Sequence, residues 1–418
     1  MRTLLKTAIL GFGREGKAVL RFLRNHNVKN TSILDRKFDK DYLKNLNQFD
    51  IIYRSPGVPY NLREIQAAIK SGVEISCATD LFFQNAKGRI IGITGTKGKG
   101  TTSTLIYKIL KAAGKDVYLA GNIGKPAIDI LPKLKKNSIT VLELSSFQLQ
   151  DLKHSPNISV VLGIYPDHLD AHKNFKEYLN AKSSVTRYQT REDKVFYLSS
   201  DKYSALLGKM SKGRKIPVDF KKFNLFKEKD LKILGRHNFK NAVIAATVAK
   251  NLGIPSKTII KVVKNYRGLP YRLEFIKTIR GRKIYNDSAS TNPMTTVAAI
   301  KSFATPNIMI VGGKDKNLDY RPLGKALSAK GGSTSGGKNS ATYLTILFGE
   351  NKFKIKKALR GNKFAMVSNL KTALKLALKN SKPGDAIVFS PGSTSFDMFI
   401  DYKDRGRKFN EIVKNMSN

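Results

Sequence analysis

The residues best suited to chemistry lie in one glycine- and lysine-rich stretch, GITGTKGKGTT, at residues 92–102. Three of its glycines, Gly95, Gly98 and Gly100, could let successive backbone N–H groups face an anion. Lys99 could reach the outer phosphates of a nucleotide, and Thr101 could ligate Mg²⁺ one place later than in the common phosphate-loop pattern. The stretch follows an apolar β-type run and precedes a helical pattern, as a phosphate loop must. We therefore predict an ATP site, with a flexible turn that binds nothing as the weaker alternative.

Two further apolar runs end in or are followed by polar residues that could take part in chemistry. Glu143 ends the run VLEL, where a buried carboxylate needs a pairing partner or a metal ion. The stretch GIYPDHLDAHKNFKEYLNAK holds several of the commonest site residues, namely Asp167, His168, Asp170, His172 and Lys182. Two of the chain's five histidines fall in this stretch, which favours a role in binding metal or phosphate over a surface position.

A second glycine motif, GFGREG, lies near the N-terminus between a β-type run and a helical pattern. Its glycines, Gly11, Gly13 and Gly16, would allow a diphosphate to approach the start of the helix. Asp35 ends the next β-type run about 20 residues later, where an acid can accept a hydrogen bond from a ribose or a base. From these residues alone, an NAD-type site, the diphosphate of another ligand and an empty turn all stay open.

These motifs lie on alternating β-type and helical segments, which favours parallel sheets covered by helices. The first series runs from KTAILGFG to VEISCA, and the second begins at GRIIGIT. The third follows the turn-rich NYRGLPYR and includes KIYND, NIMIVGG, LTILFG, KFAMVS and DAIVFS. We predict an α/β protein with a Rossmann-like domain at residues 1–88, a phosphate-loop-type ATPase domain at 89–269 and a Rossmann-like domain at 270–418. The Gly/Ser-rich segment 328–341 is expected to be a surface loop.

Composition narrows the class of protein. Cys77 is the single cysteine, so no internal disulfide can form, and this fits a reducing cytoplasm. No apolar run approaches the ~18 residues of a membrane helix. The apolar start of the chain is too short for a signal peptide and is interpreted as a first strand. We expect a cytoplasmic protein with no membrane partner.

The formal net charge is +45, from 76 Lys and Arg against 31 Asp and Glu. Such an excess can indicate a nucleic-acid-binding ATPase. However, the lysines are spread from end to end, with no basic tail and no aromatic–basic repeat. We therefore favour a lysine-rich surface, expect no nucleic-acid partner, and expect the charge to attract anionic substrates over long range.

Four segments together resemble the central domain of the Mur ligases: GTKGKGTT, GNIGKPAI, LELSSFQL, and DHLDAH with the later AK. The resemblance continues in order to the C-terminus through GLPYRLE, NDSASTNP, GGKDKNLDY and SPGSTSFDMFIDYKDRG. It implies an ATP- and Mg²⁺-dependent ligase, similar to the member that adds D-glutamate to UDP-N-acetylmuramoyl-L-alanine through an acyl phosphate in peptidoglycan precursor synthesis. It also places a UDP tail, in place of NAD, at GFGREG. We expect a monomer.

The resemblance implies a role for each matching residue. The catalytic residues would be Lys99, Glu143, His168 and Lys182. The metal ligands would be Thr101, Glu143, His168 and Lys182, the last as a carbamate. ATP would be bound by Gly95, Thr96, Lys97, Gly98, Lys99, Gly100, Thr101, Asn238, Asn241, Arg272 and Asp287. The UDP substrate would be held by Gly13, Arg14, Asp35, Arg36, Ser55, Pro56, Gly57 and Asn122. D-glutamate would be held by Lys316, Ser395 and Phe396, with Tyr402 where an aromatic residue is expected.

Two positions depart from the family pattern. Ala289 stands where the family often has lysine, which removes a positive contact near the acceptor. A related ligase with another acceptor is therefore an alternative. Gly100 is more typical of folylpolyglutamate synthases, but those enzymes lack a UDP-binding first domain like the one indicated here. His168 and Asp170 are the candidates to take the proton of the attacking amine.

Overall fold

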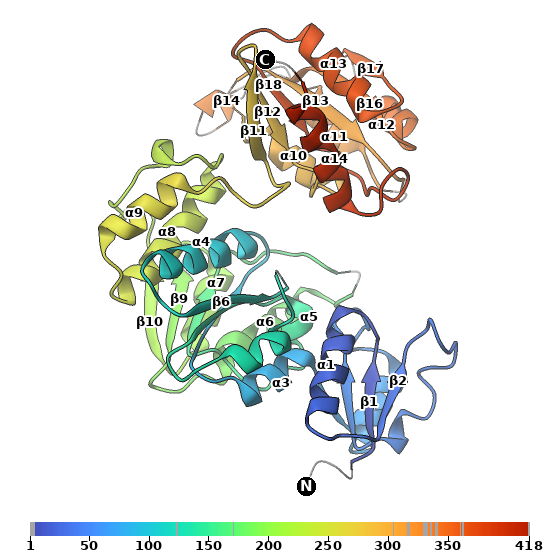
Figure 1. The fold of residues 1–418 in the computed structure, drawn as a ribbon, viewed down its shortest axis with the longest axis vertical. Coiled ribbons are helices and arrows are strands. Elements are labelled where there is room, and N and C mark those ends of the chain that lie inside the picture. Colours follow the sequence, from blue (N-terminus) through green and yellow to red (C-terminus); the bar gives the residue numbers. More distant parts are fainter. Residues whose placement is uncertain are drawn as a thin grey trace. The chain divides into compact units, whose positions relative to one another are not determined.

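The computed structural model describes residues 5–122, 124–169, 171–303, 305–315, 318–328, 333–334, 337–338, 342–359, 361 and 363–416. Three large sheets with flanking helices follow one another along these residues (Figure 1). This confirms the α/β class and the parallel sheets expected from the sequence. The chain divides into two compact units, the first made of Met1–Phe226 and Lys240–Val263, the second of Lys227–Phe239 and Lys264–Asn418. The first two sheets belong to the first unit and the third sheet to the second.

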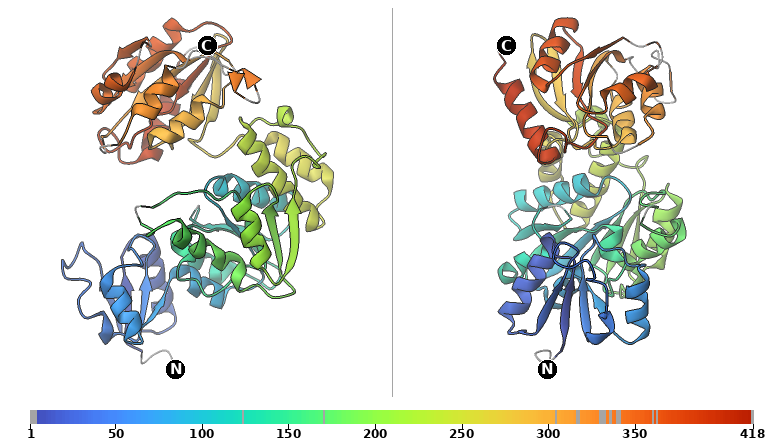
Figure 2. Two further views of the ribbon diagram at one scale, coloured as in Figure 1. Left: turned by 180° about the vertical axis from the view of Figure 1, so that it is seen from behind. Right: turned by 90° about the vertical axis from the view of Figure 1, so that its right-hand side faces the viewer.

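The first sheet is parallel throughout, with strand order β2-β1-β3-β4. Its strands are β1 (Thr7–Leu10), β2 (Thr31–Leu34), β3 (Ile51–Arg54) and β4 (Glu74–Ser76), and its helices are α1 (Arg14–Asn25), η2 (Leu46–Gln48), α2 (Arg63–Lys70) and α3 (Ala78–Asn85). Successive residues of a strand point to opposite faces. Ile9 therefore packs in one core with Val19 of α1, whereas Leu10 packs in another with Ile65 of α2. Helices accordingly cover both faces of this sheet (Figure 2).

The second sheet is also parallel, with order β10-β9-β8-β5-β7-β6. Its strands are β5 (Arg89–Thr94), β6 (Val117–Gly121), β7 (Ile139–Glu143), β8 (Ile158–Val161), β9 (Lys194–Leu198) and β10 (Arg214–Val218). Glu143 is in register with Ile93 on one side and Gly121 on the other. The carboxyl ends of β5, β6 and β7 therefore lie together at one edge of the sheet, where ligands bind in open α/β sheets.

Helices and short 3₁₀ turns connect these strands and continue the chain. They are α4 (Lys99–Ala112), η3 (Ala127–Lys133), α5 (Ser146–Leu149), α6 (Phe175–Arg187), α7 (Lys202–Met210), η4 (Glu228–Asp230), α8 (Arg236–Asn251) and α9 (Ser256–Asn265). The division between the two units falls within α8 and within α9. The domain boundaries near residues 88 and 269 stay a prediction.

The third sheet has order β11-β12-β18-β13-β16-β17, with β11 antiparallel and the other strands parallel. Its strands are β11 (Glu274–Ile279), β12 (Arg282–Asn286), β13 (Asn307–Gly312), β16 (Thr342–Phe348), β17 (Phe364–Met366) and β18 (Ala386–Phe389). Its helices are α10 (Pro293–Ile300), α11 (Arg321–Leu327), α12 (Lys352–Ala358), α13 (Leu370–Asn380) and α14 (Tyr402–Lys414). Ile310 packs in one core with Phe409 of α14, and Val311 in the other with Leu323 of α11, so each face of the sheet has its own core.

Most of the segment 328–341, expected to be a surface loop, lies outside the described residues. The described part contains β14 (Ser333–Thr334) and β15 (Gly337–Lys338), which pair antiparallel. Within the described ranges, no helix has both the length and the apolar character needed to cross a membrane.

Candidate active site

The loop between β5 and α4 has a backbone conformation that glycine adopts more readily than other residues. Gly95 and Gly98 have φ angles of +145° and +88°, which L side chains rarely adopt. A Cβ atom on Gly95 would lie 2.6 Å from Cβ of Leu162, and one on Gly98 would lie 2.3 Å from Oδ1 of Asn241. Both contacts are too short, so these positions require glycine. The loop ends at the N-terminus of α4, where the N–H groups of a first helical turn are available to an anion.

Lys99 is the first residue of α4, and its side chain folds back over the loop. Its Nζ donates to the carbonyl oxygens of Gly95 and Thr96, both at 3.0 Å. The hydroxyl of Thr96 bonds to the Tyr165 carbonyl and to the Tyr178 hydroxyl, each at 3.0 Å, which ties the loop to the segment after β8 and to α6. Lys99 thus holds its ammonium group at the mouth of the loop.

The neighbouring residues of the loop have different surroundings. Lys97 pairs with Asp167 at 3.0 Å, and more than half of the lysine side chain is exposed. Burial raises the pKa of Asp167, but the bond and charge of Lys97 outweigh it and leave that pKa below its usual value. Gly100 and Thr101 continue the first turn of α4, where Thr101 is half-buried.

Lys182, on α6, is a buried lysine directly behind the loop. Its side chain is 1% exposed, and its Nζ lies 3.0 Å from the Gly95 carbonyl oxygen and 3.4 Å from Oγ1 of Thr94. Nζ also lies 4.7 Å from the centroid of the Tyr178 ring. Burial, followed by the charge of Lys99, lowers the pKa of Lys182 well below its usual value. Burial therefore favours the neutral form of this amine, which is the nucleophilic one.

Glu143 ends β7 at the same edge of the sheet and is 6% exposed. The side-chain amide of Asn122 donates to its Oε1 at 3.1 Å, so the residue that follows β6 is joined to the residue that ends β7. Among the residues that the structure describes, no group of three or more histidine, cysteine, aspartate and glutamate side chains could hold a metal ion. A cation here would need ligands from phosphate and water as well as from protein. Mg²⁺ commonly binds in this way in phosphate-transfer sites.

The loop after β8 contributes His168 and His172 in contrasting environments. His168 is about half exposed, has a φ of +55°, and lies with its ring 5.1 Å from that of Phe147. His172 is 1% exposed, bonds through Nε2 to the Ser146 hydroxyl at 3.0 Å, and has its pKa lowered by burial. His168 is thus accessible to a ligand, whereas His172 supports the loop. Asp170 lies outside the described residues.

A cleft of about 490 Å³ in the first unit brings several of these residues together. Lys99, His168 and Lys182 line it from the second sheet and its loops. Asn122 joins them after β6, and Pro56 and Gly57 come from the turn after β3 of the first sheet. Residues expected to serve the phosphates and residues expected to serve the UDP substrate therefore face one space.

The other residues expected to hold the UDP substrate lie around the loop from β1 to α1. Gly13 is the N-cap of α1, and Arg36 is exposed. Asp35 accepts from the N–H groups of Phe12 at 2.5 Å and Lys37 at 2.9 Å, and these bonds lower its pKa. Ser55 donates to the Gly11 carbonyl at 2.5 Å. These contacts order the loop but leave its ligand untested.

Arg14 has a second role that its sequence motif did not indicate. Its guanidinium donates to the carbonyl oxygens of Gly121 and Gly124, at 3.3 and 3.2 Å, next to Asn122. It therefore links the start of α1 to the turn after β6. The arginine lies beside the expected substrate residues while already bonded to the protein.

Several expected ligand residues lie in the second unit. Asp287 is buried and accepts from Ser390 Oγ at 2.7 Å and from Ser290 Oγ, and burial raises its pKa to about 6. Asn238 donates to the Leu234 carbonyl at 2.8 Å. Two other expected ligand residues of this unit are exposed, Arg272 and Phe396, the latter by 62%, whereas Ser395 is buried. Lys316 lies outside the described residues, and Asn241 lies in the first unit against Gly98.

The cleft is also lined by residues that were not identified from the sequence. They include Glu15, Tyr60, Ser145, Phe147, Gln148, Gln150 and Tyr178. One signal was available: Ser145 and Gln148 form a capping box at the start of α5, and S-x-x-Q is its sequence pattern. Gln148 Nε2 also donates to Oε1 of Glu15 at 2.7 Å, and burial raises the pKa of Glu15. That contact spans 133 residues of sequence, so spacing could not reveal it.

Comparison with known proteins is consistent with this arrangement. The model of the Mur ligase middle domain matches residues 93–230, and that of the Mur ligase, glutamate ligase domain matches residues 271–392. A protein of Aquifex aeolicus named UDP-N-acetylmuramoylalanine–D-glutamate ligase is 36% identical, over 98% of this chain and 99% of its own. A protein of the same name from Acetivibrio thermocellus is 33% identical, over 98% of this chain and 96% of its own.

Solved structures share the fold at lower identity. UDP-N-acetylmuramate-alanine ligase MurC from Thermotoga maritima has a TM-score of 0.59 at 17% identity, covering 98% of this chain and 99% of its own. A pseudomurein peptide ligase type C from Methanothermus fervidus has a TM-score of 0.57 at 18% identity, covering 99% of this chain and all of its own. With relatives above 30% identity along nearly its whole length and matching models for two domains, the chain belongs to the Mur ligase family.

Proposed function

We propose that this chain is an ATP-dependent ligase that joins D-glutamate to UDP-N-acetylmuramoyl-L-alanine, a step in peptidoglycan precursor synthesis. The name of its curated relatives states this pair of substrates. The observation that carries the proposal is the cleft of the first unit, where Lys99 and Lys182 share one space with the Pro56–Gly57 turn and Asn122. We assign residues 1–88 to UDP-substrate binding, 89–269 to ATP binding and 270–418 to the amino acid.

The reaction must activate a carboxylate, because oxide is too poor a leaving group for an amine to displace. The L-alanyl carboxylate attacks the γ-phosphorus of ATP, which gives an acyl phosphate and ADP. The amine of D-glutamate then attacks the acyl carbon, and the tetrahedral species collapses with loss of phosphate to form the amide. The proton of the amine passes to a base, for which His168 and Asp170 are the candidates.

The residues of the cleft suit this chemistry through charge and position. Lys99 and the glycine loop would offset the negative charge that shifts during phosphoryl transfer. A neutral Lys182 can react with carbon dioxide to form a carbamate, whose oxygens are ligands suited to Mg²⁺. Mg²⁺ would be held by Thr101, Glu143, His168 and this carbamate, and it supplies further neutralisation of phosphate charge when bound. These residues fit the ion because Glu143 is a buried carboxylate with an amide as a described partner.

The second unit would supply the amino-acid site and part of the nucleotide site. Ser395, Phe396 and Lys316 are our candidates for D-glutamate, and Asn238, Arg272 and Asp287 for the nucleotide. Ala289 leaves this acceptor site one cation short of the usual family pattern. We further propose that the protein works as a monomer in the cytoplasm, where ATP is available.

An acceptor screen tests the proposal. The protein is incubated with ATP, Mg²⁺ and UDP-N-acetylmuramoyl-L-alanine, and phosphate release is measured with each candidate amino acid. D-glutamate should give the highest kcat/KM. A preference for another amino acid would retain a ligase and reject the acceptor, whereas no release with any of them would reject the function.

The role of Lys99 is tested by Lys99→Ala. Loss of the ammonium group at the phosphates should lower kcat/KM by about 10²- to 10³-fold, the usual cost of removing one preorganised charge partner. Lys111→Ala is the matched control, since Lys111 is exposed in the last turn of the same helix. Near-normal turnover by a folded Lys99→Ala protein would contradict this role.

A further inference from the structure

We propose that Arg54 and Asp151 are positioning residues that hold the substrate turn after β3 and helix α5 in one fixed arrangement. This inference rests on the proposed function for the identity of the substrate. Arg54 is the last residue of β3 in the first sheet, and Asp151 follows α5 in the second. Both belong to the first unit.

The pair is buried and bidentate. The Arg54 and Asp151 side chains are 1% and 2% exposed. Arg54 Nε donates to Oδ2 of Asp151 at 2.7 Å, and Nη2 donates to Oδ1 at 2.9 Å. This geometry fixes the direction of the guanidinium plane as well as its distance from the carboxylate.

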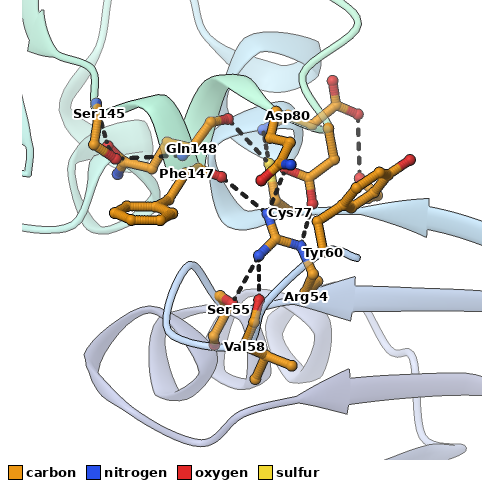
Figure 3. A network of polar contacts seen from close by, with 12 residues as sticks. Arg54, Ser55, Val58, Tyr60, Cys77, Asp80, Ser145, Phe147 and Gln148 are labelled. Carbon is orange, nitrogen blue, oxygen red and sulfur yellow. Dashed lines mark hydrogen bonds and ion pairs between the residues drawn. The ribbon is translucent and has the colours of Figure 1, made fainter. Parts of the chain in front are cut away.

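The same guanidinium binds backbone carbonyls on both sides (Figure 3). Nη1 donates to the carbonyl oxygens of Val58 at 2.5 Å and Ser55 at 3.4 Å, which are the two ends of a tight turn. Nη2 also donates to the carbonyl oxygen of Phe147 in α5 at 2.9 Å. Pro56 and Gly57, between the two anchored carbonyls, line the cleft. One side chain therefore sets the place of the turn relative to α5.

Residues of helix α5 contact other groups in and around the cleft. The ring of Phe147 lies 5.1 Å from that of His168, and the hydroxyl of Ser146 bonds to His172 at 3.0 Å. Gln148 donates to Glu15 at the start of α1. A shift of α5 would thus move groups that line the cleft on both sides.

Energetics favour a positional role over a stabilising one. Removing two charges from water costs about as much as their attraction returns, and apolar replacements of buried pairs are often neutral or stabilising. The pair therefore needs another reason to be present in the protein. Arginine is suited to positioning because its planar group offers five donors in a fixed fork, whereas lysine is a point charge.

The test replaces both charges together, with Arg54→Met and Asp151→Leu, so that no buried charge loses its partner. KM for UDP-N-acetylmuramoyl-L-alanine should rise about tenfold or more, and by more than KM for ATP, because Arg54 anchors the substrate turn directly and reaches the ATP side of the cleft only through α5. The matched control is Arg21→Gln with Asp129→Asn. That exposed pair, at 2.7 Å, also joins α1 of the first sheet to η3 of the second, yet it lies outside the cleft.

The inference is overturned if the folded double variant keeps the wild-type KM for the UDP substrate, or if KM for ATP rises equally. A second variant, Arg54→Lys, keeps a cation but loses the fork, and is followed by amide hydrogen exchange. Amides of Ser55, Gly57 and Val58 and of residues 146–151 should exchange faster than in the wild type, and unchanged exchange would also overturn the inference. Wild-type protein that does not use the UDP substrate would reject the proposed function, and exchange alone would then decide on Arg54.

Discussion

Lys182 shows how the fold can turn an ordinary side chain into a reactive one. A surface lysine is almost fully protonated at neutral pH, and a protonated amine cannot react with carbon dioxide. Burial behind the phosphate loop, with Lys99 nearby, lowers the pKa of Lys182 well below its usual value. The spacing of the sequence does not show this effect, because Thr94 and Gly95, which contact Nζ, lie 88 and 87 residues away.

We expect wild-type protein kept in ¹³C-bicarbonate to show a carbamate carbonyl signal by NMR, and Lys182→Met to lack it. The same substitution should lower kcat by about 10²-fold or more, because the carbamate oxygens that would hold Mg²⁺ at the phosphates are lost. Acetate should restore part of the activity by occupying the vacated space. Lys202→Met, at the exposed start of α7, is the control. A signal of equal size in both variants would contradict carbamylation at Lys182.

Asp287 is a buried acid whose ionisation should make stability depend on pH. Burial raises its pKa to about 6, although hydrogen bonds from Ser290 and Ser390 oppose the shift. Because the folded pKa is above the unfolded value, the protonated acid favours folding at low pH. This contribution is lost as pH rises from about 4 to 6, and it amounts to the order of 3 kcal/mol.

Asp287→Asn removes that dependence. The thermal midpoint of the variant relative to the wild type should therefore increase between pH 4.5 and pH 7, whatever constant offset the substitution brings. Differential scanning calorimetry at several pH values measures this difference. Asp385→Asn serves as the control for general effects of losing a carboxylate from the second unit. A difference that stays constant with pH would show that Asp287 does not carry the effect.

At the scale of elements, the phosphate loop and α4 form one structural unit, and the conformation of its loop depends on glycine. Gly98→Ala adds a Cβ at 2.3 Å from Asn241 Oδ1 in a left-handed backbone region, so the backbone is strained and either the loop or the Asn241 side chain must shift. We expect KM for ATP to rise about tenfold or more, since the donors to the phosphates are displaced. Gly114→Ala is a sharp control, because Gly114 also has a positive φ, of +73°, but has open space around it at the far end of the same helix. Equal changes in KM for the two variants would reject the effect of the contact.

The order of the elements could be predicted because each motif begins where an apolar run ends. GRIIGIT predicted β5, and the glycine stretch after it predicted the start of α4. Both faces of the parallel strands are buried, so continuous apolar runs such as NIMIVGG could be assigned to strands from their length and the glycines that follow. The Mur ligase resemblance then gave the family, which the family comparisons confirm.

The lining of the cleft could be predicted only in part. Lys99 lies in a motif that carries its own signal and Pro56 was assigned through the family resemblance, whereas Tyr60 and Gln150 lie in segments with no feature that marks a site. Their position depends on how the first and second sheets pack within the first unit. Arg54 is the strongest example, because a charged residue ending a strand reads as solvent-exposed, yet it is 1% exposed against Asp151. Pairing across 97 residues of sequence leaves no local pattern.

At the scale of the whole molecule, the charge of +45 is the most unusual property. It is spread over the chain and gives no sign of a basic tail, so it acts as a long-range field. Both proposed nucleotide substrates are polyanions, and D-glutamate carries a net negative charge. A positive field raises the rate at which such ligands meet the protein, and salt screens it over about 10 Å at 0.1 M.

We therefore expect kcat/KM for UDP-N-acetylmuramoyl-L-alanine to fall about three- to tenfold between roughly 20 and 300 mM KCl, while kcat stays nearly constant, because screening acts on encounter and not on bound groups. Sucrose at matched viscosity controls for slower diffusion. Replacing exposed lysines that do not line the cleft by glutamine, for example Lys209, Lys212 and Lys371, should weaken the salt dependence without changing kcat. The three positions lie in both units, so their combined effect reports on the field of the whole chain. If salt lowered kcat as much as kcat/KM, the excess charge would have no part in substrate capture.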